Sequence, residues 1–121
     1  MKTPVVQFYE GPHDLTLEPG KRVYRYSFDR ATARSIYWEL DLTFPPPGQR
    51  IDFEVEASWY KSDGTQMIRQ PISAHVNSDW GSSWHTLGYG WVEPGHWLPG
   101  SYQVDFSYKN VRIASGTFQI N

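Results

Sequence analysis

The side chains best suited to binding or chemistry gather in one stretch of the sequence, from His75 to Trp97. Nine residues in it combine aromatic rings with carboxylates and imidazoles: Asp79, Trp80, Trp84, His85, Tyr89, Trp91, Glu93, His96 and Trp97. Flat rings with polar neighbours suit a sugar surface, and Trp and Tyr also anchor protein interfaces. The stretch therefore predicts a surface for a protein partner or a glycan, with filling of the core as the structural alternative for its Trp residues.

Two histidines of this stretch raise the question of a metal site. His85 and His96, together with Asp79 or Glu93, offer the imidazole and carboxylate ligands that zinc accepts. Their spacing is irregular, however, and no two histidines stand two residues apart on a strand. We therefore expect hydrogen-bonding surface histidines, and neither a metal nor another cofactor.

A second constellation is acidic. Residues 36–44 and 51–59 alternate apolar and polar side chains, so each run predicts a strand with one buried face and one solvated face. If the two runs pair as a hairpin, four carboxylates oppose each other on its polar face: Glu39 with Glu56, and Asp41 with Glu54. Opposed like charges are unfavourable. We expect an offset from Arg22, Arg25 or Arg69, from a different pairing, or from a bound calcium ion.

Enzymatic chemistry is not expected from these carboxylates. A glycosidase needs two acids about 5–10 Å apart in a cleft that shifts their pKa values. A small domain with short loops offers little cleft, and the sequence contains no Ser-His-Asp pattern, no Gly-rich phosphate loop and no cofactor motif. The sequence thus predicts a protein that is not an enzyme.

Strands must position all of these side chains. Besides the two central runs, alternation or turn signals predict strands over the following ranges: 5–9, 23–28, 66–76, 83–91, 102–108 and 111–120, with a brief edge segment at 15–17. Seven or eight strands without a convincing helix are typical of an all-β, immunoglobulin-like antiparallel β-sandwich. The absence of cysteine argues against an antibody-type member of that class.

Local signals predict where these strands turn or bend. Asp63-Gly64 predicts a tight hairpin, and Lys109-Asn110 predicts another. Pro71 cannot donate to a ladder, so its strand should lie at a sheet edge or carry a bulge near Gln70. A change of face in the last strand predicts a bulge at Ser115-Gly116.

Chain length, net charge and composition limit the possible functions further. The 121 residues make one domain, 1–121, with a net charge of −2 and 17% aromatic residues. Without a basic excess we expect no nucleic-acid partner, and without a run of about 18 apolar residues we expect no membrane span. The first residues do not resemble a signal peptide. The compartment stays open: cytoplasmic, or exported as part of a longer protein.

Several segments resemble bacterial immunoglobulin-like domains of the E-set or fibronectin-type-III-like kind. They are Ile36–Leu40, Trp59–Gly64, Ser82–Thr86, Trp97–Val104 and Ile113–Ile120. The similarity spans roughly residues 20 to 121 and points to an uncharacterised branch of such domains. It implies a non-catalytic accessory domain of a larger bacterial protein, which docks a protein partner or a neighbouring domain of its parent chain. The alternative is a carbohydrate-binding module that uses the aromatic surface at 80–97.

Overall fold

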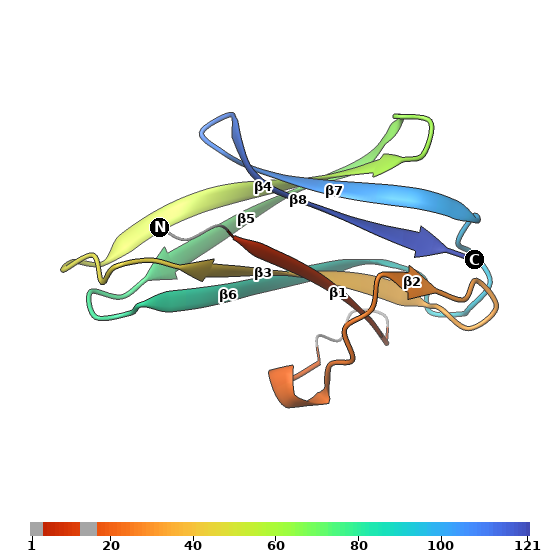
Figure 1. Cartoon of the computed structure of the whole chain (residues 1–121), viewed down its shortest axis with the longest axis horizontal. Coiled ribbons are helices and arrows are strands. Elements are labelled where there is room, and N and C mark those ends of the chain that lie inside the picture. Colours follow the sequence, from red (N-terminus) through yellow and green to blue (C-terminus); the bar gives the residue numbers. More distant parts are fainter. Residues whose placement is uncertain (1–3, 13–16) are drawn as a thin grey trace.

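The computed structural model describes residues 4–12 and 17–121, and this part of the chain forms two packed β-sheet layers, in which neighbouring strands run antiparallel apart from one short parallel pair at 27–28 with 119–120 (Figure 1). The elements in order are β1 (Val5–Gly11), the short 3₁₀ turn η1 (Pro19–Lys21), β2 (Ser27–Phe28), β3 (Ser35–Thr43), β4 (Ile51–Lys61), β5 (Gln66–Val76), β6 (Ser82–Gly90), β7 (Gly100–Tyr108) and β8 (Val111–Ile120). One sheet has the order β1-β3-β6, and the other has β2-β8-β7-β4-β5. The predicted all-β sandwich is confirmed. No helix in the described chain is long and apolar enough to cross a bilayer.

The predicted hairpin between the two central strands is wrong. β3 pairs with β1 and β6, whereas β4 pairs with β5 and β7 in the other sheet. The connection contains Pro45, Pro46 and Pro47, which cannot donate ladder hydrogen bonds and which favour a crossing between layers over a tight turn. The apolar faces of the two strands therefore meet across the core, and the expected carboxylate pairs do not form.

One buried amide joins the two sheets in the core. Trp38 on β3 and Trp59 on β4 are both fully buried, and both indole Nε1 atoms donate to Gln70 Oε1, at 3.0 and 2.8 Å. Gln70 Nε2 in turn donates to the carbonyl of Gly88 on β6 at 3.0 Å. A side-chain amide oxygen has two lone pairs, so one residue satisfies both indole donors and also ties β5 to β6.

The local signals are confirmed in part. Gly64 has a φ of +86° in the β4–β5 turn, and Lys109 and Asn110 have φ values of 50° and 64° in the β7–β8 turn. Pro71 lies on β5, which is the predicted edge strand. The predicted strand at 23–28 is reduced to β2, although Tyr24 makes a single bridge to Tyr9 of β1. Of the segment expected at 15–17, residues 15 and 16 lie outside the described chain, and Leu17 belongs to no strand.

The predicted bulge in the last strand is displaced. Phe106 pairs with Ala114 and Ser107 pairs with Arg112, so the unpaired residue of β8 is Ile113. Gly116 instead stays in register opposite Val104, and a Cβ at this position would lie only 2.6 Å from the Val6 side chain. The glycine allows β1 to approach β8 closely, which is a packing role that the sequence pattern does not reveal.

The outer face of the three-stranded sheet is covered, contrary to the expectation of a solvated polar face. A segment that includes η1 crosses below the sheet in Figure 1, and residue 22 from it is buried. The Arg22 guanidinium forms an ion pair with Glu39, and its Nε donates to the carbonyl of Leu17 at 2.7 Å. The Tyr24 hydroxyl donates to the same Glu39 carboxylate at 2.5 Å. The expected offset by basic neighbours is therefore confirmed here, as it is at Glu56, which Arg69 contacts at 2.5 Å.

Asp41 lies two residues from Glu39 on the same face of β3, and the two carboxyl groups are hydrogen-bonded to each other. Burial raises the pKa of Asp41, and the hydrogen bond and negative charge of Glu39 raise it further, to about 7. Burial opposes ionisation of Glu39 as well, but hydrogen bonds from Asp41, Tyr24 and Arg22 outweigh it, so the pKa of Glu39 is lowered. In the folded domain Asp41 therefore keeps its proton at mildly acidic pH.

We expect Gln70→Leu to lower the free energy of unfolding by about 2–6 kcal/mol, because two buried indole N–H groups lose their acceptor at about 1–3 kcal/mol each. Urea unfolding followed by Trp fluorescence measures the change. Gln66→Leu is the matched control, since Gln66 is exposed on the same strand. It should stay within about 0.5 kcal/mol of the wild type. Equal stabilities for Gln70→Leu and Gln66→Leu would contradict this account.

We expect Asp41 to make the domain less stable as the pH rises from about 4.5 to about 7. Its pKa is raised on folding from 3.8 to about 7, so in this window the folded state holds a proton that the unfolded chain releases. Urea unfolding measured between about pH 4.5 and 7 should show that the free energy of unfolding falls with rising pH in the wild type and in an Asp52→Asn control. The slope should be reduced in Asp41→Asn. A slope that Asp41→Asn leaves unchanged would show that Asp41 titrates normally.

Candidate functional site

The nine residues of the predicted surface separate into two groups at opposite ends of β6. One group lies at the start of β6 and in the loop before it: Asp79, Trp80, Trp84 and His85. The other lies at its end and in the loop that follows: Tyr89, Trp91, Glu93, His96 and Trp97. A strand of nine residues is about 30 Å long, at about 3.3 Å per residue. The structure therefore does not bring the nine side chains into one surface.

The second group mainly closes one end of the sandwich. Trp97 is only 1% exposed, and its Nε1 donates to the carbonyl of Arg34 at 2.9 Å. Trp91 meets the Trp97 ring edge-on at 5.4 Å, and Tyr89 packs against both. His96 stacks on Trp91 at 5.5 Å. Filling of the core therefore describes Trp97, with the partly buried Tyr89 and Trp91 packed against it, whereas Glu93 and His96 are exposed in the loop.

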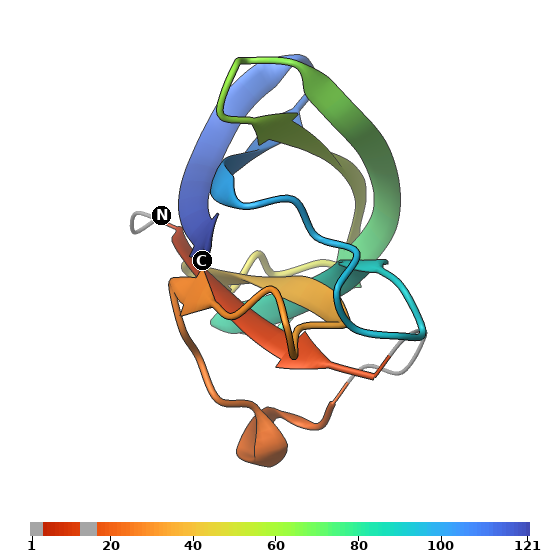
Figure 2. The ribbon, with the colours of Figure 1, turned by 90° about the vertical axis from the view of Figure 1, so that its right-hand side faces the viewer.

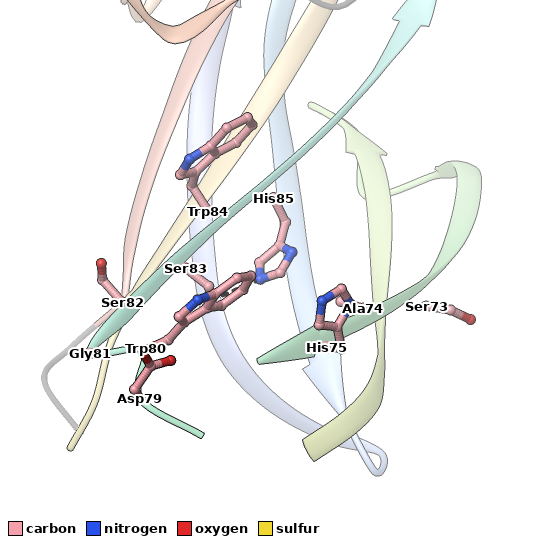
Figure 3. Close-up of a pocket in the computed structure, with 10 residues that line it drawn as sticks. All are labelled: Ser73, Ala74, His75, Asp79, Trp80, Gly81, Ser82, Ser83, Trp84 and His85. Carbon is pink, nitrogen blue, oxygen red and sulfur yellow. Dashed lines mark hydrogen bonds between the residues drawn. The ribbon is translucent and has the colours of Figure 1, made fainter. Parts of the chain in front are cut away.

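The first group lines an open hollow of about 700 Å³ between the neighbouring edges of β5 and β6 (Figure 3). Its wall is formed by Ser73, Ala74, His75, Asp79, Trp80, Gly81, Ser82, Ser83, Trp84 and His85. All four predicted residues of the group belong to this wall. The wall residues from β5, which are Ser73, Ala74 and His75, were not among the nine predicted residues. The short connection 77–81 already implies that the end of β5 lies beside the start of β6.

Trp80 and His75 form the floor of the hollow. The Trp80 indole is 37% exposed, and its ring lies 5.5 Å from the His75 imidazole at an angle of 31°. Figure 3 shows these two rings and His85 turned toward one another, with Asp79 at the rim. An aromatic floor with carboxylate and imidazole groups around it can hold both apolar and hydrogen-bonding groups of a ligand.

Among the described residues, Trp84 is the most exposed tryptophan, at 52%. It points to the outer side of β6, where the Arg22 guanidinium carbon lies 4.7 Å from its ring centroid. Arg22 is itself fixed by Glu39 and by a second cation–π contact with Tyr9, at 4.8 Å. The buried cation therefore holds a large apolar ring in place at the surface, which lowers the entropy that binding would otherwise cost.

His85 lies on the inner side of β6 and is partly buried. Its Nε2 is 3.0 Å from the Ser83 hydroxyl, and its ring meets Phe53 edge-on at 5.7 Å. Burial lowers the pKa of His85, and the nearby His75 lowers it further, so the imidazole is neutral at pH 7. Within the described residues no carboxylate bonds its other nitrogen, so the Ser83–His85 pair lacks the orienting group of a hydrolytic triad.

Metal ligands do not assemble around the predicted histidines. His85 and His96 belong to the two separate groups, and His96 stacks on an indole. Across residues 4–12 and 17–121, no cluster of three His, Cys, Asp or Glu side chains has the geometry to hold an ion. What the hollow presents is aromatic surface with imidazole and hydroxyl groups and one carboxylate, that of Asp79.

Comparison with known proteins supports the fold only. No family model matches the sequence, and no curated protein matches it. An immunoglobulin-like protein from Pseudomonas aeruginosa aligns over 100% of this chain and 94% of its own, with 8% identity and a TM-score of 0.54. The DNA glycosylase AlkC from Pseudomonas fluorescens, bound to DNA with an abasic-site analogue, aligns over 79% of this chain and 28% of its own, with 12% identity and a TM-score of 0.53. The strand order and these likenesses together show that the chain is an immunoglobulin-like β-sandwich.

Proposed function

We propose that this immunoglobulin-like domain is a non-catalytic interaction module that docks a protein partner, or a neighbouring domain of a longer chain, at the hollow beside β6. One observation carries the proposal: Trp80 in the hollow and Trp84 on the outer side of the adjoining strand are 37% and 52% exposed, while Trp38, Trp59 and Trp97 are buried. Exposed indoles beside a concave surface are the anchors that dominate protein interfaces.

The chemistry around the indoles supports a protein partner. Trp84 is held by Arg22 on its outer side, and the wall also offers the hydroxyls of Ser73, Ser82 and Ser83. An apolar centre with a neutral polar rim is the usual composition of a non-obligate interface. The only charged side chain of the wall is Asp79, which is exposed at its margin.

A glycan is the second candidate, and Trp80 favours it. This ring stands between His75 and Asp79, so a sugar stacked on it would find hydrogen-bonding partners beside it. Figure 3 shows Trp84 apart from Trp80, nearer the outer face of the sheet. A glycan held in the hollow would therefore depend on Trp80 more than on Trp84.

We expect a photo-crosslinking amino acid at Asp79 to capture a protein that the same group at Lys61 does not, because Lys61 is exposed in the other sheet. After identification by mass spectrometry and purification, calorimetry gives the affinity of that protein for the domain. Trp84→Ala should weaken it by tenfold or more, as the loss of an anchor does. Val92→Ala, at a 70% exposed residue in the opposite loop, should leave it unchanged.

Two results would count against a protein partner. Equal capture at Asp79 and Lys61 would place the interaction elsewhere, and an unchanged affinity in Trp84→Ala would remove the proposed anchor. Glycan-array binding that Trp80→Ala abolishes and Trp84→Ala retains would instead favour the second candidate. Urea unfolding of each variant confirms that the exposed residue was replaced without loss of the fold.

A further inference from the structure

The edges of the two sheets are not equally protected. An exposed edge strand offers unpaired backbone groups, and proteins cover such edges or place proline and charged residues on them. The edge of β1 is covered, because Arg25 N donates to the carbonyl of Phe8 at 2.9 Å and Tyr24 bridges to the same strand. β5 carries Pro71 and the exposed Arg69, and β2 has only two residues.

Within the described structure, β6 carries neither proline nor a charged residue, and its free edge is covered at Gly88 by the Gln70 side chain. The strand ends the three-stranded sheet and runs for nine residues, Ser82–Gly90. Its side chains still include two exposed apolar groups, Trp84 at 52% and Leu87 at 40%. A long, uncharged and partly apolar edge is the kind that pairs with another strand.

The direction of the backbone groups along this edge follows from two hydrogen bonds. The Phe8 carbonyl points away from β3, so the residues on either side of Phe8 are the ones that hydrogen-bond to β3. Because the bonding direction alternates along each strand, the odd-numbered residues of β6 hydrogen-bond to β3. The carbonyl of Gly88 accordingly points to the free side, where Gln70 donates to it. By the same alternation the N–H and C=O groups of Trp84 and Thr86 point to the free edge.

The hollow lies alongside this part of the edge. Its wall takes residues 82–85 from β6 and residues 73–75 from the facing edge of β5. Gln70 closes the edge at Gly88, so the open run extends from Ser82 to Thr86. Five residues of strand span about 17 Å at about 3.3 Å per residue, which is enough for a short added strand.

We propose that the partner of this domain adds an extended strand to the open edge of β6. The inference rests on the proposed function and names the form of its partner: an uncharged segment in which apolar and hydroxyl side chains alternate. Its backbone pairs with the outward N–H and C=O groups of Trp84 and Thr86. Its side chains on the outer face lie against the Trp84 indole, and those on the inner face enter the hollow.

Amide hydrogen exchange tests this pairing directly. The probe is a blocked hexapeptide of alternating Thr and Val at millimolar concentration, with the same peptide carrying Pro at its third position as the control. We expect the alternating peptide to slow exchange of the Trp84 and Thr86 amides at least tenfold, because these amides become hydrogen-bonded. The amides of His85 and Leu87, which already bond to β3, should change little, and the Pro peptide should have a smaller effect.

A matched pair of variants separates backbone pairing from side-chain contact. Ser82 is exposed and directs its N–H to the free edge, so Ser82→Pro removes one edge donor while Ser82→Ala keeps it. The protection should fall in Ser82→Pro and persist in Ser82→Ala. Both variants should keep the wild-type midpoint in urea within the effect expected of a surface change.

Four outcomes would overturn the inference. If the peptide shifts resonances of the hollow but leaves the Trp84 and Thr86 amides exchanging freely, binding is through side chains; if no peptide protects them, the edge is closed. If protection grows with protein concentration in the absence of peptide, a second copy of this chain occupies the edge. A partner captured at Asp79 whose binding leaves these amides exchanging would uphold the proposed function and refute strand addition alone.

Discussion

The Gln70 amide is the interaction on which the rest of the sandwich depends. Its oxygen accepts from an indole of each sheet, Trp38 and Trp59, and its nitrogen donates to the edge strand β6 at Gly88. Two large rings can lie fully buried in one core only if their N–H groups have partners. The same amide fixes the spacing between β5 and β6. It thereby fixes where their edges are joined and where the hollow between them begins.

The strand types and turns could be predicted from the sequence, but the pairing of the central strands could not. The alternation of apolar and polar residues in 36–44 and 51–59 predicts that each strand has one buried face. Two such faces can lie side by side in one sheet or opposite each other across the core, and the pattern is the same in both cases. In the structure the prolines at 45–47 carry the chain across to the other layer, and the hydrogen bonds of Trp38 and Trp59 to Gln70 hold the two strands on opposite sides of the core.

The candidate site was predictable only in part, for a similar geometric reason. Proximity along the chain from residue 79 to residue 97 suggested one surface, but β6 occupies the middle of that stretch and separates its ends. Arg22, which holds Trp84, is distant in sequence and carries no signal of this role. Burial of the polar face of β3 depends equally on the segment at 17–25: the acidic residues predicted a basic neighbour such as Arg22, but no local pattern predicted that this segment covers the sheet.

The covering segment also explains why the two edges of the three-stranded sheet differ. Residues 24 and 25 bond to the edge of β1, so this side of the sheet is closed by the chain itself. Arg22 from the same segment reaches across the sheet through Glu39 on β3 and ends against Trp84 on β6. One segment therefore protects the first edge and places an ordered indole beside the second. Within the described residues, the open edge of this sheet at β6 thus lies next to a fixed aromatic ring, and this asymmetry is what the proposed strand addition would use.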